Sequence, residues 1–257
     1  MLAKHSDLKN FLDLKAEQYN KPSFINTDPI CIPHKFRAKE DIEISAFMSA
    51  TIAWGQRKTI IQNANKIVLL MDDKPYDFIM HASAKDLKSF SNFVHRTFNG
   101  DDIIFFLTSL MNIYRNHGGL YQIFEAEYKK NQSIPDALSA LRNTFFEIPH
   151  LSRSTKHFSD VSKNSSAKRL NMFLRWLVRN DKTGVDFGIW NNISPSDLYI
   201  PLDVHSGNVA RKLGLLKRTQ NDWKAVNELT LKLREFDSHD PIKYDFALFG
   251  LGAFENF

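Results

Sequence analysis

Apolar residues recur along most of this chain with the three- and four-residue spacing of an amphipathic α-helix. The clearest predicted helices span residues 8–19, 40–54, 60–68, 103–114, 138–146, 168–179, 204–213, 222–236 and 240–250. Phe occurs 21 times and Gly only 10 times, a balance that favours packed helices over glycine-rich phosphate loops. Short extended pieces are expected only near 186–190 and 199–202. The sequence therefore predicts an all-α fold.

Length and composition restrict the class of protein. The 257 residues suffice for one compact unit, and 43% hydrophobic with 25% charged residues is ordinary for a folded domain. No stretch reaches the roughly 18 consecutive apolar residues of a membrane span, and residues 1–10 lack the apolar core of a secretory signal. Cys31 is the only cysteine, which excludes an internal disulfide and a four-cysteine metal site. We therefore expect a cytoplasmic protein with no membrane partner, metal ion or cofactor.

Positive charge is concentrated in one part of the sequence. Between residues 153 and 182 eight basic residues stand against two acidic ones, while the whole chain carries only +5. A second basic run without acids follows, formed by Arg211, Lys212, Lys217 and Arg218. Such concentration is typical of proteins that contact a phosphate backbone. The alternative is a solvated helical face with scattered counter-ions.

The predicted helix at 168–179 has two different sides. Its apolar residues cluster on one side of the helical wheel, and Lys168, Arg175 and Arg179 fall along the opposite side. This basic side is either a solvent-facing surface or the wall of a cleft. In a cleft, neighbouring positive charge would favour the free amine of Lys168, which is a nucleophile.

Asp203 directly precedes the predicted helix at 204–213. An aspartate there serves as an N-cap, because its carboxylate accepts hydrogen bonds from backbone N–H groups of the first turn. The helix dipole keeps such a carboxylate ionised, and the same helix end can face an anion such as phosphate. A capping role and a chemical role are therefore compatible.

Two segments resemble the helix–hairpin–helix DNA glycosylases, the superfamily of endonuclease III and 8-oxoguanine DNA glycosylase. Lys168-Arg169-Leu170-Asn171-Met172-Phe173-Leu174 matches the Lys-x-x-Asn-x-x-Leu pattern of the bifunctional members. Pro201-Leu202-Asp203-Val204-His205, followed by Arg211-Lys212-Leu213-Gly214, matches their Pro-Val-Asp-x-His segment and its helix. With residues 41–58, the resemblance covers about half of the chain. The whole chain also looks like a member of an uncharacterised bacterial family within or near this superfamily.

The resemblance implies a two-lobed helical fold with a cleft between the lobes. Residues 36–180 would form one lobe, and residues 1–35 with 181–257 the other. The implied activity is excision of a damaged base, such as 8-oxoguanine, with AP-lyase strand cleavage. Lys168 would attack the sugar C1′ and hold a Schiff base, while Asp203 would stabilise the positively charged sugar.

The resemblance also implies which residues bind the partner, a duplex with a damaged or abasic site. These DNA-binding residues would be Arg169, Asn171, Arg175, His205, Ser206 and Arg211, with Trp54, Gln56 and Arg57 in the turn that enters DNA. The protein would act as a monomer.

The sequence departs from the superfamily at three places. The glycine-rich hairpin is replaced by Asn164-Ser165-Ser166-Ala167, thirty-five positions separate Lys168 from Asp203, and the cysteine cluster of endonuclease III is absent. Two other functions therefore stay open. One is a DNA-binding protein without catalysis on the same scaffold, and the other is a helical adaptor whose basic surface meets an acidic protein. Only the adaptor should lack affinity for duplex DNA at low salt.

Overall fold

The computed structural model describes residues 2–255 and 257, and in this part of the chain it contains helices and turns but no β-strand. Two isolated β-bridges, His95 with Phe98 and Ser165 with Asp222, are the only extended pairings among these residues. The extended pieces expected near 186–190 and 199–202 form no strand. The predicted all-α fold is confirmed.

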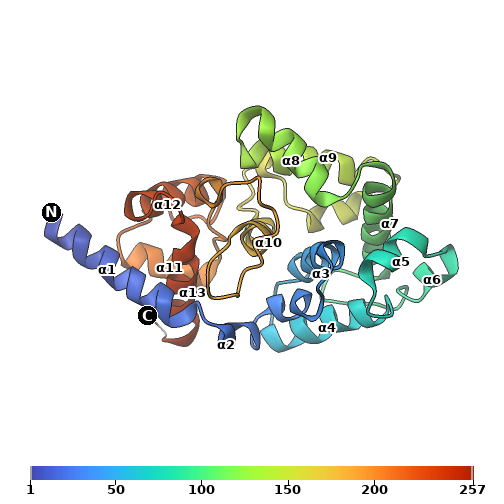
Figure 1. Cartoon of the computed structure of the whole chain (residues 1–257), viewed down its shortest axis with the longest axis horizontal. Coiled ribbons are helices and arrows are strands. Elements are labelled where there is room, and N and C mark those ends of the chain that lie inside the picture. Colours follow the sequence, from blue (N-terminus) through green and yellow to red (C-terminus); the bar gives the residue numbers. More distant parts are fainter. Residues whose placement is uncertain (1, 256) are drawn as a thin grey trace. The chain divides into compact units, whose positions relative to one another are not determined.

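The α-helices are shown in Figure 1. In chain order they are α1 (Leu2–Tyr19), α2 (Pro22–Ile25), α3 (Lys39–Thr51), α4 (Arg57–Leu69), α5 (Pro75–His81), α6 (Ala84–Lys88), α7 (Gly100–Asn116), α8 (Leu120–Asn131), α9 (Ile134–Phe145), α10 (Lys168–Val178), α11 (Val204–Lys212), α12 (Trp223–Phe236) and α13 (Tyr244–Phe254). Short 3₁₀ helices are η1 (Pro29–Cys31), η2 (Pro33–Lys35), η3 (Ser152–His157), η4 (Val161–Lys163), η5 (Pro195–Asp197) and η6 (Pro241–Lys243). Each predicted helix has a counterpart, whereas α2, α5, α6 and α8 were not predicted. In α8 the buried Leu120, Phe124 and Tyr128 recur every four residues.

The chain divides into two compact units. We call Met1–Phe24 with Val161–Phe257 the terminal unit, and Ile25–Asp160 the central unit. The predicted boundaries, after residues 35 and 180, differ from these. Residues 29–35 belong to the central unit because η1 and η2 pack on α4 and α3, and α10 belongs to the terminal unit because its arginines pair with carboxylates there.

The core of the central unit is aromatic. Phe47 of α3, Phe106 of α7 and Phe145 of α9 are each at most 1% exposed. The ring centroid of Phe145 lies 4.7 Å from that of Phe106 and 5.6 Å from that of Phe47. Such pairs contribute about 0.5–1.5 kcal/mol each beyond their burial. These contacts explain why Phe is so frequent in this sequence.

Helix α13 is the centre of the terminal unit and packs against α1 and α11 (Figure 1). Two glycines permit these close approaches. A Cβ atom at Gly250 would lie 2.1 Å from the ring of Tyr19 in α1, and one at Gly252 would lie 3.0 Å from Cβ of His205 in α11. The sequence Gly-Leu-Gly in α13 therefore serves helix packing.

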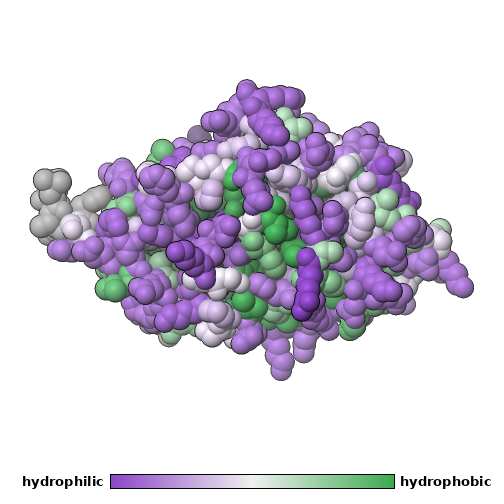
Figure 2. Space-filling model, viewed as in Figure 1, coloured by the Kyte–Doolittle hydropathy of each residue, from purple (hydrophilic) through white to green (hydrophobic). Residues whose placement is uncertain are grey.

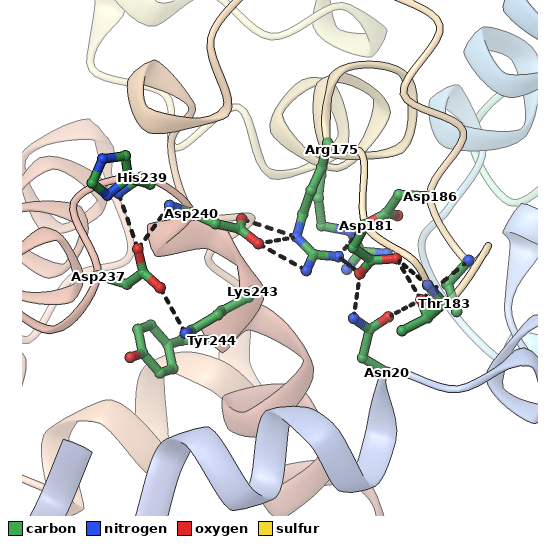
Figure 3. Close-up of polar contacts among 12 residues, drawn as sticks. Asn20, Arg175, Asp181, Thr183, Asp186, Asp237, His239, Asp240, Lys243 and Tyr244 are labelled. Atoms are coloured by element: carbon green, nitrogen blue, oxygen red, sulfur yellow. Dashed lines mark hydrogen bonds and ion pairs between the residues drawn. The ribbon is translucent and has the colours of Figure 1, made fainter. Parts of the chain in front are cut away.

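Arg175 of α10 and Arg179, the C-cap of this helix, are buried among aspartates. Figure 3 labels Arg175 together with Asp181, Asp186 and Asp240. Arg175, 4% exposed, pairs with Asp245 of α13 at 2.5 Å and with Asp186 at 3.3 Å. Arg179, 3% exposed, pairs with Asp181, Asp186 and Asp240 at 2.6, 3.0 and 2.9 Å. These ion pairs join α10, the loop after it, and the segment that leads into α13.

This arrangement corrects the predicted basic side of the 168–179 helix. Arg175 and Arg179 were expected on the surface with Lys168, because they lie opposite the apolar residues of that helix. They are buried instead, because they pair with Asp181 and Asp186 of the following loop and with the distant Asp240 and Asp245. In the second basic run, Arg218 pairs with Asp222, and Arg211 Nε donates to the Arg218 carbonyl at 2.8 Å. The surface is thus less basic near α10 than the sequence suggested.

The segment 152–166, predicted as an exposed loop or a connection between lobes, is partly folded. It contains η3 and η4, and within it Ser154 and His157 are buried. The boundary between the two units falls inside it, after Asp160.

Hydrophilic side chains predominate on the face of the molecule drawn in Figure 2. Across the described residues, we find no helix with both the length and the apolar character that a transmembrane span requires.

Replacing Arg175 by Met should lower the free energy of unfolding by about 3–5 kcal/mol, because Asp245 then lacks its buried counter-charge. The matched control is Lys232→Met in α12, where an exposed pair with Glu235 at 2.7 Å should contribute less than about 1 kcal/mol. Urea denaturation of both variants measures the difference. Equal losses would show that the buried ion pairs do not stabilise the terminal unit.

Candidate active site

The turn before α10 holds an unusual backbone conformation. Asn164 and Ala167 both have left-handed φ angles, +61° and +47°, that glycine adopts most easily. Helix α12 holds this turn: Trp223 N–H donates to the Asn164 carbonyl at 3.1 Å, and Asn164 Nδ2 donates to Asp222 at 2.9 Å. The segment that lacks the glycines of a hairpin is thus still folded as a tight turn.

Lys168 is the first residue of α10 and follows this turn directly. Its side chain is partly exposed, and its Nζ lies 3.5 Å from Sδ of Met172. Among the described residues no carboxylate lies within ion-pair distance of this amine. The lysine is therefore not committed to a structural ion pair.

Asp203 is the N-cap of α11, as predicted. Its Oδ1 accepts hydrogen bonds from the backbone N–H and the hydroxyl of Ser206, both at 3.0 Å, and Asp203 N–H donates to the Ser206 hydroxyl in return. Its carbonyl accepts from Asn221 Nδ2 at 3.0 Å. Within the described part of the protein, Oδ2 has no hydrogen-bond partner. One carboxylate oxygen thus caps the helix while the other stays available.

Lys168 and Asp203 both influence the pKa of a third group, the carboxyl of Asp245 in α13. Burial raises the pKa of Asp245 to about 6; Arg175 opposes this rise, Asp203 adds to it and Lys168 opposes it. The amine and the carboxylate are therefore both within electrostatic reach of one buried side chain. All three residues belong to the terminal unit, and we call Lys168, Asp203 and Asp245 the candidate site.

The other predicted DNA-binding residues of the terminal unit differ in their exposure to solvent. His205 is exposed on the first turn of α11, beside the exposed Val204. Arg169 is partly exposed, and burial of its guanidinium lowers its pKa to about 10, so it remains charged at neutral pH. Arg211 is partly exposed and uses Nη2 to bind Asn221 at 2.6 Å. Of these residues, His205 is the one most open to solvent.

Three predicted DNA-binding residues do not lie on the surface as that role requires. Asn171 is 1% exposed, and its Nδ2 donates to the Ser166 carbonyl at 3.2 Å. Ser206 is 1% exposed and completes the cap of Asp203. Arg175 is held by Asp186 and Asp245. Instead, Asn171 binds the backbone before α10, Ser206 binds Asp203, and Arg175 pairs with Asp245.

Trp54, Gln56 and Arg57 lie in the central unit, in the turn between α3 and α4. The Trp54 ring stacks on His157 at 5.9 Å and meets His95 edge-on at 4.9 Å, while His95 Nε2 donates to the Trp54 carbonyl at 3.0 Å. Trp54 is thus held by packing and hydrogen bonding.

Gln56 is exposed, and its side chain makes no capping bond to α4. Arg57, the first residue of α4, lines a pocket of about 320 Å³ with Lys58 and Gln62. The turn between α3 and α4 therefore presents polar and basic side chains at its tip.

Asp245 and Asn221 were not predicted from the sequence. Asp245 is the single charged residue of α13, in the sequence Tyr-Asp-Phe-Ala-Leu-Phe-Gly-Leu-Gly-Ala-Phe. A charged residue within an otherwise apolar helix indicates a buried partner, because an unpaired buried charge is costly. That signal could have identified Asp245, although not its neighbours.

The cap at Asp203 predicts how two substitutions affect stability. Asn caps helices about as well as Asp, so Asp203→Asn should change the free energy of unfolding by less than about 0.5 kcal/mol, whereas Asp203→Ala should lower it by about 1 kcal/mol. Urea denaturation distinguishes the two variants. An Ala variant as stable as the wild type would show that the cap does not contribute to the free energy of unfolding.

Residues 28–254 match a family described as "Protein of unknown function (DUF2400)". Neither the curated proteins nor the solved structures with which we compared the chain include a match. The match spans the whole central unit apart from its first residues, and α10, α11 and α13 with the candidate site. The chain belongs to the DUF2400 family.

Proposed function

We propose that this protein is a DNA glycosylase with AP-lyase activity that excises an oxidised purine, such as 8-oxoguanine, from duplex DNA. The observation that carries the proposal is that the terminal unit holds Lys168 at the start of α10, without a carboxylate partner, and Asp203 at the start of α11, with one carboxylate oxygen open. An amine without a structural partner and a carboxylate with one open oxygen are the two groups that this chemistry requires. The resemblance of both segments to helix–hairpin–helix glycosylases supports the same assignment.

In the proposed reaction, the damaged nucleotide leaves the base stack at a cost on the order of a few kcal/mol. The neutral amine of Lys168 bonds to C1′ of the sugar, the glycosidic bond breaks, and the base takes up a proton as it departs. The ionised Asp203 stabilises the positive charge that develops on the sugar. The resulting Schiff base permits strand cleavage. A lysine suits this step and an arginine does not, because the lysine amine can lose its proton near neutral pH.

The proposed DNA contacts use side chains that are exposed or partly exposed, and backbone groups at one helix end. In the terminal unit these are His205 and Val204, together with backbone N–H groups at the start of α10, where no side chain caps the helix. In the central unit they are Gln56, Arg57 and Lys58 of the turn between α3 and α4. Neither Arg175 nor Arg179 is included, because their charges are used inside the protein.

Borohydride trapping on duplexes that contain 8-oxoguanine or an abasic site tests the role of Lys168. Borohydride reduces a Schiff base to a stable covalent adduct, so the wild type should be trapped and Lys168→Gln should not. The control is Lys182→Gln, which makes the same chemical change at an exposed lysine of the terminal unit and should leave trapping intact. A wild-type protein that is trapped on neither duplex would eliminate the lyase assignment.

Asp203→Asn should retain binding to damaged duplex, since the cap and the fold remain, while base release falls by about 10²–10³-fold through loss of the negative charge. Binding is measured by fluorescence anisotropy over a range of salt concentrations, and base release by cleavage of a labelled strand. Unchanged base release would reduce Asp203 to a helix cap. Absence of duplex binding at low salt would favour the adaptor function instead.

A further inference from the structure

Two turns of the central unit lie against each other. The first, residues 54–58, joins α3 to α4, and the second, residues 94–97, precedes α7. The side chain of Arg96 crosses the first turn at Gly55, where a Cβ atom would lie 3.1 Å from Cδ and 3.2 Å from Nη1 of Arg96. Gly55 also has a φ of +104°, which residues with a side chain rarely adopt. The glycine therefore allows the guanidinium group of Arg96 to lie close to the backbone of the first turn.

His95 fastens the second turn to the first. Its Nε2 donates to the Trp54 carbonyl at 3.0 Å, and its Nδ1 accepts a hydrogen bond from Nδ2 of Asn63 in α4 at 2.9 Å. The rings of His95 and Trp54 meet edge-on at 4.9 Å, and His95 is only 2% exposed. One buried side chain therefore joins both turns and α4.

The second turn is also held by contacts with other parts of the central unit. His95 and Phe98 exchange two backbone hydrogen bonds, at 2.8 and 2.9 Å, and Phe98 is fully buried. Arg153 Nη2 donates to the Thr97 carbonyl at 3.1 Å. Between these contacts Arg96 adopts a left-handed φ of +54°. Such a conformation is costly for arginine and persists only where the surrounding structure fixes it, so the backbone of Arg96 is held in one conformation.

The surface formed by these two turns is basic. Arg96 and Lys58 are exposed and Arg57 is partly exposed, and neither turn contains an acidic residue. Among the described residues, no carboxylate pairs with Arg96 or Lys58. Arg57 and Lys58 also line the pocket of about 320 Å³ beside the first turn. Positive charge that the fold holds in place before a ligand arrives is complementary to the phosphate backbone of a nucleic acid.

We propose that residues 54–58 and 94–97 form one phosphate-binding surface, in which Arg96 binds a phosphodiester group of duplex DNA. The DNA contacts of the central unit proposed above all come from the first turn, and Arg96 adds a contact from a separate segment. This inference rests on the proposed function for the identity of the partner. It does not depend on catalysis, because a phosphate contact carries no sequence information and forms on undamaged duplex as well.

Fluorescence anisotropy with a labelled, undamaged duplex over a range of salt concentrations tests the contact. Each phosphate contact contributes about 0.9 to the slope of log K against the logarithm of the salt concentration. Arg96→Gln should therefore make the slope shallower by about 0.9 and weaken binding by about eightfold near 0.1 M salt. Arg96→Lys keeps the charge and should retain the slope. Both variants should fold, because residue 96 is exposed.

The matched control is Arg115→Gln, the same change at an exposed arginine in the last turn of α7. Helix α7 has 17 residues and is therefore about 25 Å long, and Arg96 precedes its start. The control should leave the slope and the affinity as in the wild type. A wild-type slope in Arg96→Gln, an equal loss in Arg115→Gln, or a loss in Arg96→Lys as large as in Arg96→Gln would overturn the inference.

Binding and trapping together separate the possible failures. If the wild type binds duplex but is never trapped by borohydride, the lyase assignment falls, and the salt slopes still decide the role of Arg96. If trapping occurs and Arg96→Gln keeps the wild-type slope, the inference about Arg96 falls and the proposed function stands. If the wild type binds no duplex even at low salt, both fall.

Discussion

The burial of two arginines, Arg175 in α10 and Arg179 at its C-cap, is the constraint on which the terminal unit depends. A guanidinium group stays charged at any physiological pH, so Arg175 and Arg179 must find carboxylates inside the protein. They find Asp181, Asp186, Asp240 and Asp245, which come from the loop after α10 and from the start of α13. A missing partner would leave a charge buried without compensation, which costs several kcal/mol. The pairing therefore ties the distant parts of this unit to a single helix.

This use of charge changes the meaning of the basic composition. Much of the positive charge near α10 neutralises internal aspartates. The basic residues that remain exposed in the terminal unit are lysines, Lys163, Lys182, Lys212 and Lys217 among them. In the proposed activity, the phosphate contacts of this unit would therefore use His205 and backbone N–H groups at the start of α10.

Structural and chemical roles are combined at the same residues in the candidate site. Asp203 uses one oxygen to cap α11 and leaves the other open. Asp245 accepts a hydrogen bond from Arg175 Nη1 and so links α13 to α10. The turn before Lys168 reaches left-handed backbone angles without glycine because α12 binds it through Asn164. In the proposed activity, the same contacts that stabilise the terminal unit would also position its reacting groups.

The amino-acid sequence by itself determined the helical class, the positions of most helices and the cap at Asp203. These depend on periodic apolar residues and on local hydrogen bonds, which residues close in the chain decide. The two candidate chemical residues were also found in the sequence, but only through a resemblance in two short segments. The tertiary structure alone decided that Arg175 and Arg179 are buried and that Asp245 is a partner of Arg175. Those outcomes depend on aspartates up to seventy residues away, and no local pattern records which distant carboxylate a buried guanidinium will meet.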